Sequence, residues 1–379
     1  MKIYKLALND IKNFLYSLDC DKSGIAIMSK KAKIHTLFIK DLHVGAANIL
    51  KQDALSIGAD LAVPEGVIVA KERYVNALLL GTTKHFEILS RKELAQPFGL
   101  KELAKNLKDF VKEQKFSTKI MGVLNANEDS FFKNSRFDNS NASQRIEKMI
   151  EDGANIIDIG AASSRPGSLP ISCDEELNRV KDIVQTIYKN RFFEKVDFSI
   201  DSFSPKVIEY VLENGFKIVN DITGLQNDEV CSLVAKYKAQ AVIMHMQNNQ
   251  TNMQEKPYYE DIMLDIDDFF KQRVEKAKSF GIEDIVLDVG IGFGKTLEHN
   301  LKLLKNLEHF NHFGYPLLIG ASRKSMIDMI TKSAIEDRLS GTLAIHLEAL
   351  KNGASIIRCH DVKEHFQAIR VFETINEIN

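Results

Sequence analysis

From Lys119 onward, short apolar runs alternate with longer amphipathic segments, and eight such pairs can be counted. The apolar runs are bounded by turn or polar residues, as buried strands are. They cover residues 120–124, 156–159, 198–200, 218–219, 241–244, 285–287, 317–319 and 356–357. The segments that follow them carry apolar residues at three- and four-residue spacing, which is typical of a helix with one buried face. They cover residues 145–151, 175–188, 206–213, 229–237, 261–279, 300–310, 337–351 and 364–378.

Strict alternation of strands and helices predicts a parallel sheet, because parallel neighbours are joined by a crossover that is usually a helix. Eight pairs in about 260 residues fit a (β/α)₈ TIM barrel. An open doubly wound sheet is the alternative, and the barrel is favoured because the count is eight and no ninth pair follows. We therefore expect an α/β fold in which a small α+β domain, residues 1–115, precedes a (β/α)₈ TIM barrel, residues 116–379.

The first 115 residues have weaker periodicity than the rest of the chain. Residues 36–40, 61–63 and 86–89 are predicted to be strands, and residues 46–57 and 100–111 are predicted to be helices. Asp41 and His43 form an Asp-x-His pair that could ligate a metal, although an ordinary surface pair is the favoured interpretation. No motif in this part predicts its role.

The composition argues against several classes of protein. The chain has 50 Lys and Arg against 52 Asp and Glu, a net charge of −2, which is unlike a nucleic-acid coat or a polybasic membrane binder. No apolar run approaches the roughly 18 residues of a membrane-spanning helix, and the N-terminus lacks the apolar core of a signal peptide. The four cysteines are scattered without a CxxC pair, as reduced thiols are. We expect a cytoplasmic protein that binds neither nucleic acid nor membrane.

Polar residues follow nearly every predicted strand. The active site of a (β/α)₈ barrel lies at the C-terminal ends of its strands, so these residues would share one rim. They are Asn125, Ser164, Arg165, Asp201, Asn220, Asp221, His245, Asp288, Ser322, Lys324, Arg358 and His360. A single polar residue after a strand is common because loops begin there, but a whole rim of them indicates a site.

This rim combines three kinds of chemistry. Its carboxylates and amide could pair with the donor and acceptor edge of a flat heterocycle: Asp201, Asn220 and Asp288. Its cations could hold a phosphate or diphosphate: Arg165, Lys324 and Arg358, with His360. Asn125 offers an oxygen to Mg²⁺, which prefers hard oxygen ligands beside substrate phosphates.

The glycine-rich segment Gly290-Ile291-Gly292-Phe293-Gly294-Lys295 is not a nucleotide-binding motif. A P-loop needs glycine where Val289 stands, and a Rossmann fingerprint needs glycine at Lys295. These glycines are expected to permit a tight turn and a close backbone approach. Among the histidines, His245 could be a ligand, but a partly buried strand-end residue is favoured. Those in helical segments are expected to be solvated: His299, His309, His312 and His365.

Taken in order, these residues resemble the dihydropteroate synthase family from Lys119 to the C-terminus. Met121-Gly122-Val123-Leu124-Asn125 resembles its first motif, and residues 153–160 with Ser164-Arg165-Pro166-Gly167 resemble its second. The other motifs match in order: Ser199-Ile200-Asp201-Ser202, Val219-Asn220-Asp221-Ile222, Leu287-Asp288 with Gly292-Phe293-Gly294-Lys295, Ser322-Arg323-Lys324-Ser325 and Arg358-Cys359-His360-Asp361-Val362. The loops Ala126-Asn127-Glu128 and Ala161-Ala162-Ser163 depart from the family pattern.

The resemblance implies a transferase of folate biosynthesis that joins 6-hydroxymethyl-7,8-dihydropterin diphosphate to 4-aminobenzoate, giving 7,8-dihydropteroate and diphosphate. It implies a pterin site of Asp201, Asn220, Asp288 and Lys324, with Asp201, Asp288 and Lys324 catalytic. It implies further substrate contacts: Ser164, Pro166, Phe293 and Ser322 for aminobenzoate, Arg165, Arg358 and His360 for diphosphate, and Met244 and Gly320 in the pocket. It also implies Mg²⁺ on Asn125 and a homodimer.

Other functions stay open on the sequence alone. A pterin-binding methyltransferase would share the ring-binding residues but has no use for the cations around Lys324 and Arg358. The altered loop Ala126-Asn127-Glu128 would suit a non-catalytic pterin-binding or interaction protein, but Asn125, Lys324, Arg358 and His360 are all present, which disfavours it. A Schiff-base aldolase would use Lys324 or Lys295, yet both adjoin loops rather than a strand interior. Residues 1–115 lie outside the resemblance. A second folate enzyme without a visible motif, and a role in assembly or barrel packing, are both open for them.

Overall fold

The computed structural model describes residues 1–4, 6–7, 10–126, 139–160, 171–248, 252–253 and 255–377, with the backbone alone for residues 139–141. The chain divides into two compact units. The larger unit comprises residues 115–311 and 315–372, and the smaller comprises residues 1–114, 312–314 and 373–379. The two units are described separately.

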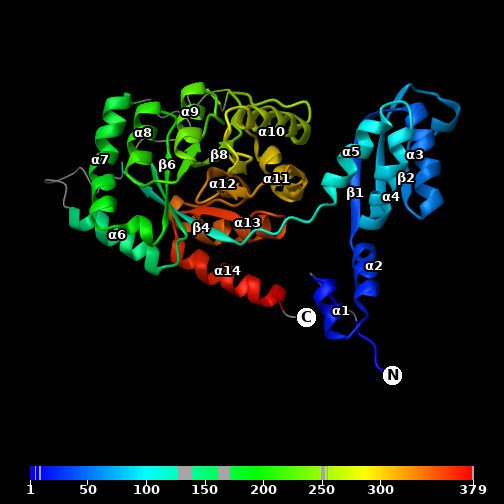
Figure 1. Cartoon of the computed structure of the whole chain (residues 1–379), viewed down its shortest axis with the longest axis horizontal. Helices are drawn as coiled ribbons and strands as arrows, with labels where there is room; N and C mark the ends of the chain where they lie inside the picture. The colour runs from blue at the N-terminus through cyan, green and yellow to red at the C-terminus, as the bar shows by residue number, and fades with distance from the viewer. Residues whose placement is uncertain are drawn as a thin grey trace. The chain divides into compact units, whose positions relative to one another are not determined.

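The larger unit contains a closed barrel of parallel strands (Figure 1). In chain order the strands are β4 (Lys119–Asn125), β5 (Ile156–Gly160), β6 (Asp197–Asp201), β7 (Ile218–Asp221), β8 (Gln240–Met244), β9 (Ile285–Asp288), β10 (Leu317–Ile319) and β11 (Ile356–Cys359). Each strand pairs in parallel with the next, and β11 pairs with β4 to close the ring. The (β/α)₈ prediction is confirmed, and all eight predicted strands fall within observed ones.

Helices that follow the strands cover the outside of the barrel, as Figure 1 shows for α7 to α10. They are α6 (Asn139–Glu151), α7 (Cys173–Lys189), α8 (Pro205–Glu213), α9 (Asp228–Tyr237), α10 (Ile262–Ser279), α11 (Leu297–Lys305), α12 (Ser325–Ile330), α13 (Leu339–Lys351) and α14 (Val362–Glu377). Helix α11 ends earlier than predicted, because the Asn306 side chain bonds the Lys302 carbonyl at 2.8 Å. Among the described residues no helix is both long and apolar enough to cross a membrane.

Apolar side chains fill the part of the barrel nearer the N-terminal ends of its strands. They come from seven strands and are at most 3% exposed: Met121, Ile156, Ile218, Val242, Val286, Leu318 and Ile356. Side chains alternate between the two faces of a strand, so the residue two positions further along also points into the barrel. This apolar floor therefore fixes which later residues on each strand face the interior.

The smaller unit is an α+β fold, as predicted. Its antiparallel sheet has the order β1-β3-β2, with β1 (Ile34–His43), β2 (Asp60–Ala62) and β3 (Tyr74–Thr82). Its helices are α1 (Ile11–Ser17), α2 (Lys22–Ala32), α3 (Val44–Ile57), α4 (Thr83–Lys92) and α5 (Leu100–Phe110). The sheet shares one apolar core with α3, α4 and α5, and this core includes Leu50, Leu79 and Leu107.

The strand predicted at residues 86–89 is wrong, because these residues lie in α4. Thr82 and His85 form a capping box that starts this helix, and Phe86 and Leu89 are buried at helical spacing. A short apolar run alone does not separate helix from strand. The third strand is β3, which the sequence analysis missed.

Asp41 and His43 have local structural roles. Asp41 lies at a register shift in β1 with a positive φ of 52°, and its N–H donates to the Asn76 side chain at 3.1 Å. His43 Nδ1 accepts from the Gly45 N–H at 3.1 Å and so caps α3, and its ring stacks on Phe98. Within the described ranges these two residues do not belong to a group of three possible metal ligands.

Candidate active site

Above the apolar floor, the strands place mostly polar residues inside the barrel. Two positions beyond the seven floor residues stand Val123, Asp158, Asn220, Met244, Asp288, Gly320 and Arg358. Asp201, the last residue of β6, pairs in register with Asn220. We call Asp158, Asp201, Asn220, Asp288 and Arg358 the polar layer. The same two-residue period that builds the apolar core therefore also builds the candidate site.

The guanidinium of Arg358 joins two carboxylates of the polar layer. Its Nε donates to Asp158 Oδ2 and its Nη2 donates to Asp201 Oδ2, both at 2.7 Å. Asn220 Nδ2 also donates to Asp158 Oδ2, at 3.1 Å. Four strands are thus linked by one continuous set of polar contacts. Asp158 is fully buried, and its Oδ1 has no hydrogen-bond partner among the described residues.

Burial shifts the protonation of this layer. It raises the pKa of Asp201 to about 7, with Arg358 opposing the rise and the Asp158 carboxylate adding to it. The two carboxylates in turn hold the pKa of Arg358 above its ordinary value, although burial acts in the other direction. Arg358 therefore stays charged, while Asp201 can gain or lose a proton near neutral pH.

Asp288 and Lys324 form the other side of the site. Asp288 is buried at the end of β9 and accepts the Gly290 N–H at 2.8 Å. Burial raises the pKa of Asp288, and the charge of Lys324 opposes that rise. Burial also lowers the pKa of Lys324 to about 8, against the pull of Asp288. The Lys324 ammonium donates to the Ile291 carbonyl and lies 4.3 Å from the centre of the Phe293 ring.

Lys295 is buried beneath the glycine-rich turn. Its Nζ lies 3.0 Å from His245 Nδ1 and donates to the carbonyls of His245, Gly290 and Phe293 at 3.2, 3.0 and 2.9 Å. Burial lowers the pKa values of both Lys295 and His245. The lysine thus ties the loop after β9 to the end of β8, and His245 is the buried strand-end residue that the sequence favoured.

The glycines of this turn act as predicted. Gly290 has a φ of 66°, and a Cβ there would lie 2.0 Å from the His245 carbonyl oxygen. Gly292 and Gly294 also have positive φ. The turn therefore depends on both the conformational freedom and the small size of glycine.

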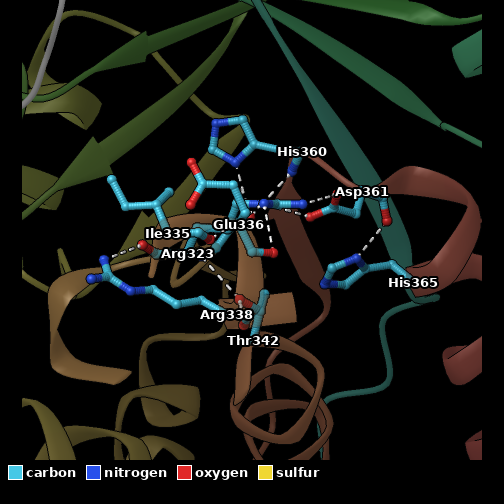
Figure 2. Close-up of polar contacts among 9 residues, drawn as sticks. Arg323, Ile335, Glu336, Arg338, Thr342, His360, Asp361 and His365 are labelled. Atoms are coloured by element: carbon cyan, nitrogen blue, oxygen red, sulfur yellow. Dashed lines mark hydrogen bonds and ion pairs between the residues drawn. The ribbon is translucent and has the colours of Figure 1, made fainter. Parts of the chain in front are cut away.

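The loops after β10 and β11 are joined to each other (Figure 2). Ser322 Oγ lies 2.9 Å from His360 Nδ1 and accepts the His360 N–H at 3.3 Å. Arg323 holds the Asp361 carboxylate at two points, with its Nε at 3.0 Å and its Nη2 at 2.6 Å. Its Nη1 donates to the carbonyls of Ile335 and Glu336. Arg323 is therefore fully engaged within the protein.

Asn125 ends β4 beside Gly160, the last residue of β5. Its Oδ1 lies 3.3 Å from the point that a Cβ on Gly160 would occupy, and Asp201 Cβ lies 3.9 Å from that point. The missing side chain at Gly160 thus leaves room around the Asn125 oxygen. An amide oxygen in such a cradle suits a hard cation such as Mg²⁺.

The structure brings most of the predicted site residues to the C-terminal end of the barrel. Those described are Asn125, Asp201, Asn220, Met244, Asp288, Phe293, Gly320, Ser322, Lys324, Arg358 and His360. Ser164, Arg165 and Pro166 lie outside the described residues, as do most of the two divergent loops.

Three buried residues were missed or misjudged from the sequence. Asp158 sits inside the apolar run 156–159, where only a lone carboxylate flanked by isoleucines marks it. Lys295 follows the last glycine of the turn and gave no sign of its burial. His365 was expected to be solvated, but it is 1% exposed and its Nε2 lies 2.8 Å from His346 Nδ1. That prediction is wrong because α14 turns this ring toward α13.

Comparison with known proteins agrees with this geometry. Residues 121–360 match a family described as "Pterin binding enzyme". A bifunctional dihydropteroate synthase/dihydropteroate reductase from Helicobacter pylori is 41% identical over 378 residues, covering 100% of both chains. The dihydropteroate synthase of Escherichia coli K12 is 42% identical over 260 residues, covering 67% of this chain and 90% of that protein.

A solved structure gives the same result for the barrel. The crystal structure of dihydropteroate synthase from Thermus thermophilus in complex with 4-aminobenzoate has a TM-score of 0.62 and 34% identity. It matches 68% of this chain and 95% of that one. The matched family spans most of the barrel, which carries the polar layer and the two joined loops. The chain therefore belongs to the dihydropteroate synthase family of pterin-binding enzymes, which are transferases.

Proposed function

We propose that this enzyme condenses 6-hydroxymethyl-7,8-dihydropterin diphosphate with 4-aminobenzoate, giving 7,8-dihydropteroate and diphosphate. The observation that carries the proposal is the polar layer inside the barrel. It offers carboxylate acceptors at Asp201 and Asp288, an amide at Asn220 and the cation Arg358, and the charge of Lys324 acts on Asp288 from the loop after β10. A pterin ring presents hydrogen-bond donors and acceptors along its edge and would find partners for both there.

In this proposal the polar layer also promotes the chemistry. Loss of diphosphate leaves positive charge on the methylene carbon of the pterin. A buried carboxylate, Asp201 or Asp288, stabilises that charge, and Lys324 orients the ring beside Asp288. The arylamine nitrogen of 4-aminobenzoate then bonds to the methylene carbon and releases one proton to solvent, so no protein nucleophile is needed. Met244 supplies an apolar contact for the ring face.

The diphosphate is assigned to the two joined loops. His360 contacts Ser322, Lys324 follows Ser322 by two residues in the same loop, and Arg165 is a further candidate from outside the described residues. Arg358 donates through Nε and Nη2 to carboxylates, which leaves Nη1 without a hydrogen bond to any described residue. We assign that nitrogen to the anion. Positive groups at the leaving diphosphate lower the barrier to its departure.

4-Aminobenzoate is assigned to the mouth of the barrel. The Thermus thermophilus synthase was solved with this compound. Phe293 and Ser322 would line the pocket here, with Ser164 and Pro166 as further candidates. Gly320 lies against the Arg358 side chain, since a Cβ at Gly320 would be in ordinary van der Waals contact with that residue's Cβ at 3.6 Å.

Asn125 would hold Mg²⁺ together with the diphosphate oxygens. When bound, the ion supplies positive charge that stabilises the leaving diphosphate. We further propose a cytoplasmic homodimer, with a domain boundary near residue 115 in each protomer. Analytical ultracentrifugation tests the dimer, and limited proteolysis tests the boundary.

Turnover of the full chain tests the proposed reaction. Diphosphate release is measured with both substrates, with and without Mg²⁺, for the wild type and for Lys324→Ala. We expect release that needs both substrates and Mg²⁺ and that falls at least about 100-fold in the variant, because a charged hydrogen bond and a ring contact are lost. No release from the wild type would favour a non-catalytic pterin-binding protein. Methyl transfer from methyltetrahydrofolate to a corrinoid would favour the methyltransferase instead.

A second activity is favoured by one observation. The Helicobacter pylori relative aligns over the whole chain and is named as a reductase as well as a synthase, whereas the Escherichia coli synthase aligns with 67% of it. We infer that this chain also reduces dihydropteroate, with the participation of residues 1–115. The test follows tetrahydropteroate formation from dihydropteroate with reduced nicotinamide and reduced flavin as hydride donors. Absence of product with both donors would contradict this inference.

A further inference from the structure

Two buried histidines lie directly beneath the joined loops. His346 on α13 and His365 on α14 are each 1% exposed, and His346 Nδ1 lies 2.8 Å from His365 Nε2. His346 Nε2 accepts the N–H of Ala321 at 3.0 Å. His365 Nδ1 lies 2.6 Å from the carbonyl oxygen of Asp361. All four ring nitrogens are therefore used.

Ala321, His346, His365 and Asp361 form a hydrogen-bonded row. The backbone partners at its two ends allow only one placement of the protons on the two rings. The Ala321 N–H can only donate, so His346 Nε2 must accept, and the His346 proton is on Nδ1. That proton is donated to His365 Nε2, so the His365 proton is also on Nδ1. It is donated to the Asp361 carbonyl, which can only accept. Each ring is neutral and carries one proton.

The backbone groups at the two ends of this hydrogen-bonded row lie next to residues assigned to substrate. Ala321 precedes Ser322, and Asp361 follows His360. The Ser322–His360 contact and the Arg323–Asp361 ion pair link the same two loops. Arg338 and Thr342 support the first loop by bonding the Arg323 backbone, at 3.1 and 2.9 Å (Figure 2). The histidine pair therefore adds a second, buried connection between the two loops.

We propose that His346 and His365 are positioning residues, which hold the loops after β10 and β11 at the spacing that lets Ser322 and His360 bind the diphosphate group together. This inference rests on the proposed function for the identity of the anion. Neither histidine touches substrate. Their effect is transmitted through Ala321 on one side and Asp361 on the other.

The proton order makes this connection sensitive to acid. A second proton on either ring would remove an acceptor nitrogen and so break one hydrogen bond of the row. The charges of His365, Lys324 and His360 disfavour protonation of His346. Asp361 and Glu364, by contrast, favour protonation of His365. Burial is the largest effect on each ring and lowers both pKa values below the ordinary 6.5. The pair is therefore neutral at pH 7 and becomes vulnerable well below it.

Two variants separate positioning from simple stability. His346→Gln keeps one donor and one acceptor but cannot take up a proton. It should keep kcat/KM within about threefold at pH 8 and lose part of the acidic fall in activity. His346→Leu leaves the Ala321 N–H without a partner and should raise the KM for the pterin diphosphate about tenfold, with a smaller effect on kcat. Asn352→Ala, at the other end of α13, is the control and should change neither KM nor the pH profile.

Nuclear magnetic resonance of ¹⁵N-histidine-labelled enzyme tests the proton order without any turnover. Both rings should be neutral at pH 7 with the proton on Nδ1. Titration with inorganic diphosphate and Mg²⁺ should show weaker binding to His346→Leu than to the wild type. A proton on Nε2 of either ring, or unchanged diphosphate binding in His346→Leu, would overturn the inference. Because neither readout needs catalysis, an inactive wild type would count against the proposed function alone.

Discussion

Asp158 and Arg358, 200 residues apart in the sequence, are joined inside the barrel by a hydrogen-bonded ion pair of 2.7 Å. The carboxylate of Asp158 is fully buried, and the arginine side chain is 21% exposed. A buried charge that loses its partner is strongly unfavourable. The pair therefore fixes the position of the Arg358 guanidinium. That position in turn limits the space that a ligand can occupy next to Asp201 and Asn220.

Asp158→Asn should destabilise the protein by about 3 kcal/mol, because it leaves Arg358 with a single carboxylate in the barrel. It should also lower kcat/KM, since the oxygen that Arg358 and Asn220 share as an acceptor no longer carries negative charge. Denaturant unfolding and steady-state kinetics measure the two effects. Asp197→Asn is the matched control, because its pair with Lys217 is exposed and should contribute less than about 1 kcal/mol. Equal effects of the two substitutions would contradict a structural role for the buried pair.

The activity should fall on the acidic side of neutrality. Burial raises the pKa of Asp201 to about 7, so below that pH the group becomes protonated and accepts hydrogen bonds poorly. The KM for the pterin diphosphate should therefore rise as the pH falls through about 7. The pH profile of kcat/KM measures this, with Asp201→Asn as the comparison. That variant should bind weakly at every pH, and an acidic limb that it leaves unchanged would assign the limb to another group.

The activity should also fall on the alkaline side. Lys324 is charged below its pKa, which burial lowers to about 8. As the pH rises through about 8 the ammonium loses its proton and no longer complements the ring or the diphosphate. Lys324→Arg stays charged throughout this range, so its remaining activity should show no such alkaline loss. A wild-type profile that is flat from pH 7 to about pH 10 would contradict a charged role for Lys324.

Gly290→Ala should be far more damaging than Gly281→Ala. Both glycines have positive φ, 66° and 83°, so alanine is strained at both by about 1 kcal/mol. Only at Gly290 would the new Cβ overlap a backbone oxygen, at 2.0 Å, and overlap of this kind adds about 1–3 kcal/mol. Thermal unfolding compares the two variants. Similar losses of stability would show that the close approach to His245 is relieved at little cost.

The barrel could be predicted because each strand and helix carries its own local signal. Eight apolar runs with intervening amphipathic segments leave few other arrangements, and loops at one end of a barrel gather the strand-end residues. The strand predicted at 86–89 failed for the opposite reason. A run of four residues is too short to distinguish the period of a helix from that of a strand. The feature that marks a helix here is the N-terminal cap formed by Thr82 and His85.

The buried polar contacts of the site could not be predicted in the same way. Asp158 and Lys295 are recognised only through partners that are distant in sequence, Arg358 for the first and His245 for the second. His365 shows the same limitation, since its helix is amphipathic and its burial depends on His346 in the preceding helix. Local patterns predict which strands and helices have a buried face, but not which polar residues are buried there or which of them bond to one another.

The central claim is that the polar layer holds the pterin ring while the joined loops hold the diphosphate. Calorimetric titration separates the two, with 6-hydroxymethylpterin and inorganic diphosphate with Mg²⁺ as independent ligands. We predict that Asp288→Asn weakens binding of the pterin about tenfold or more and leaves diphosphate binding unchanged, and that His360→Ala does the reverse. Equal weakening of both ligands by either variant, or unchanged pterin binding in Asp288→Asn, would contradict the account.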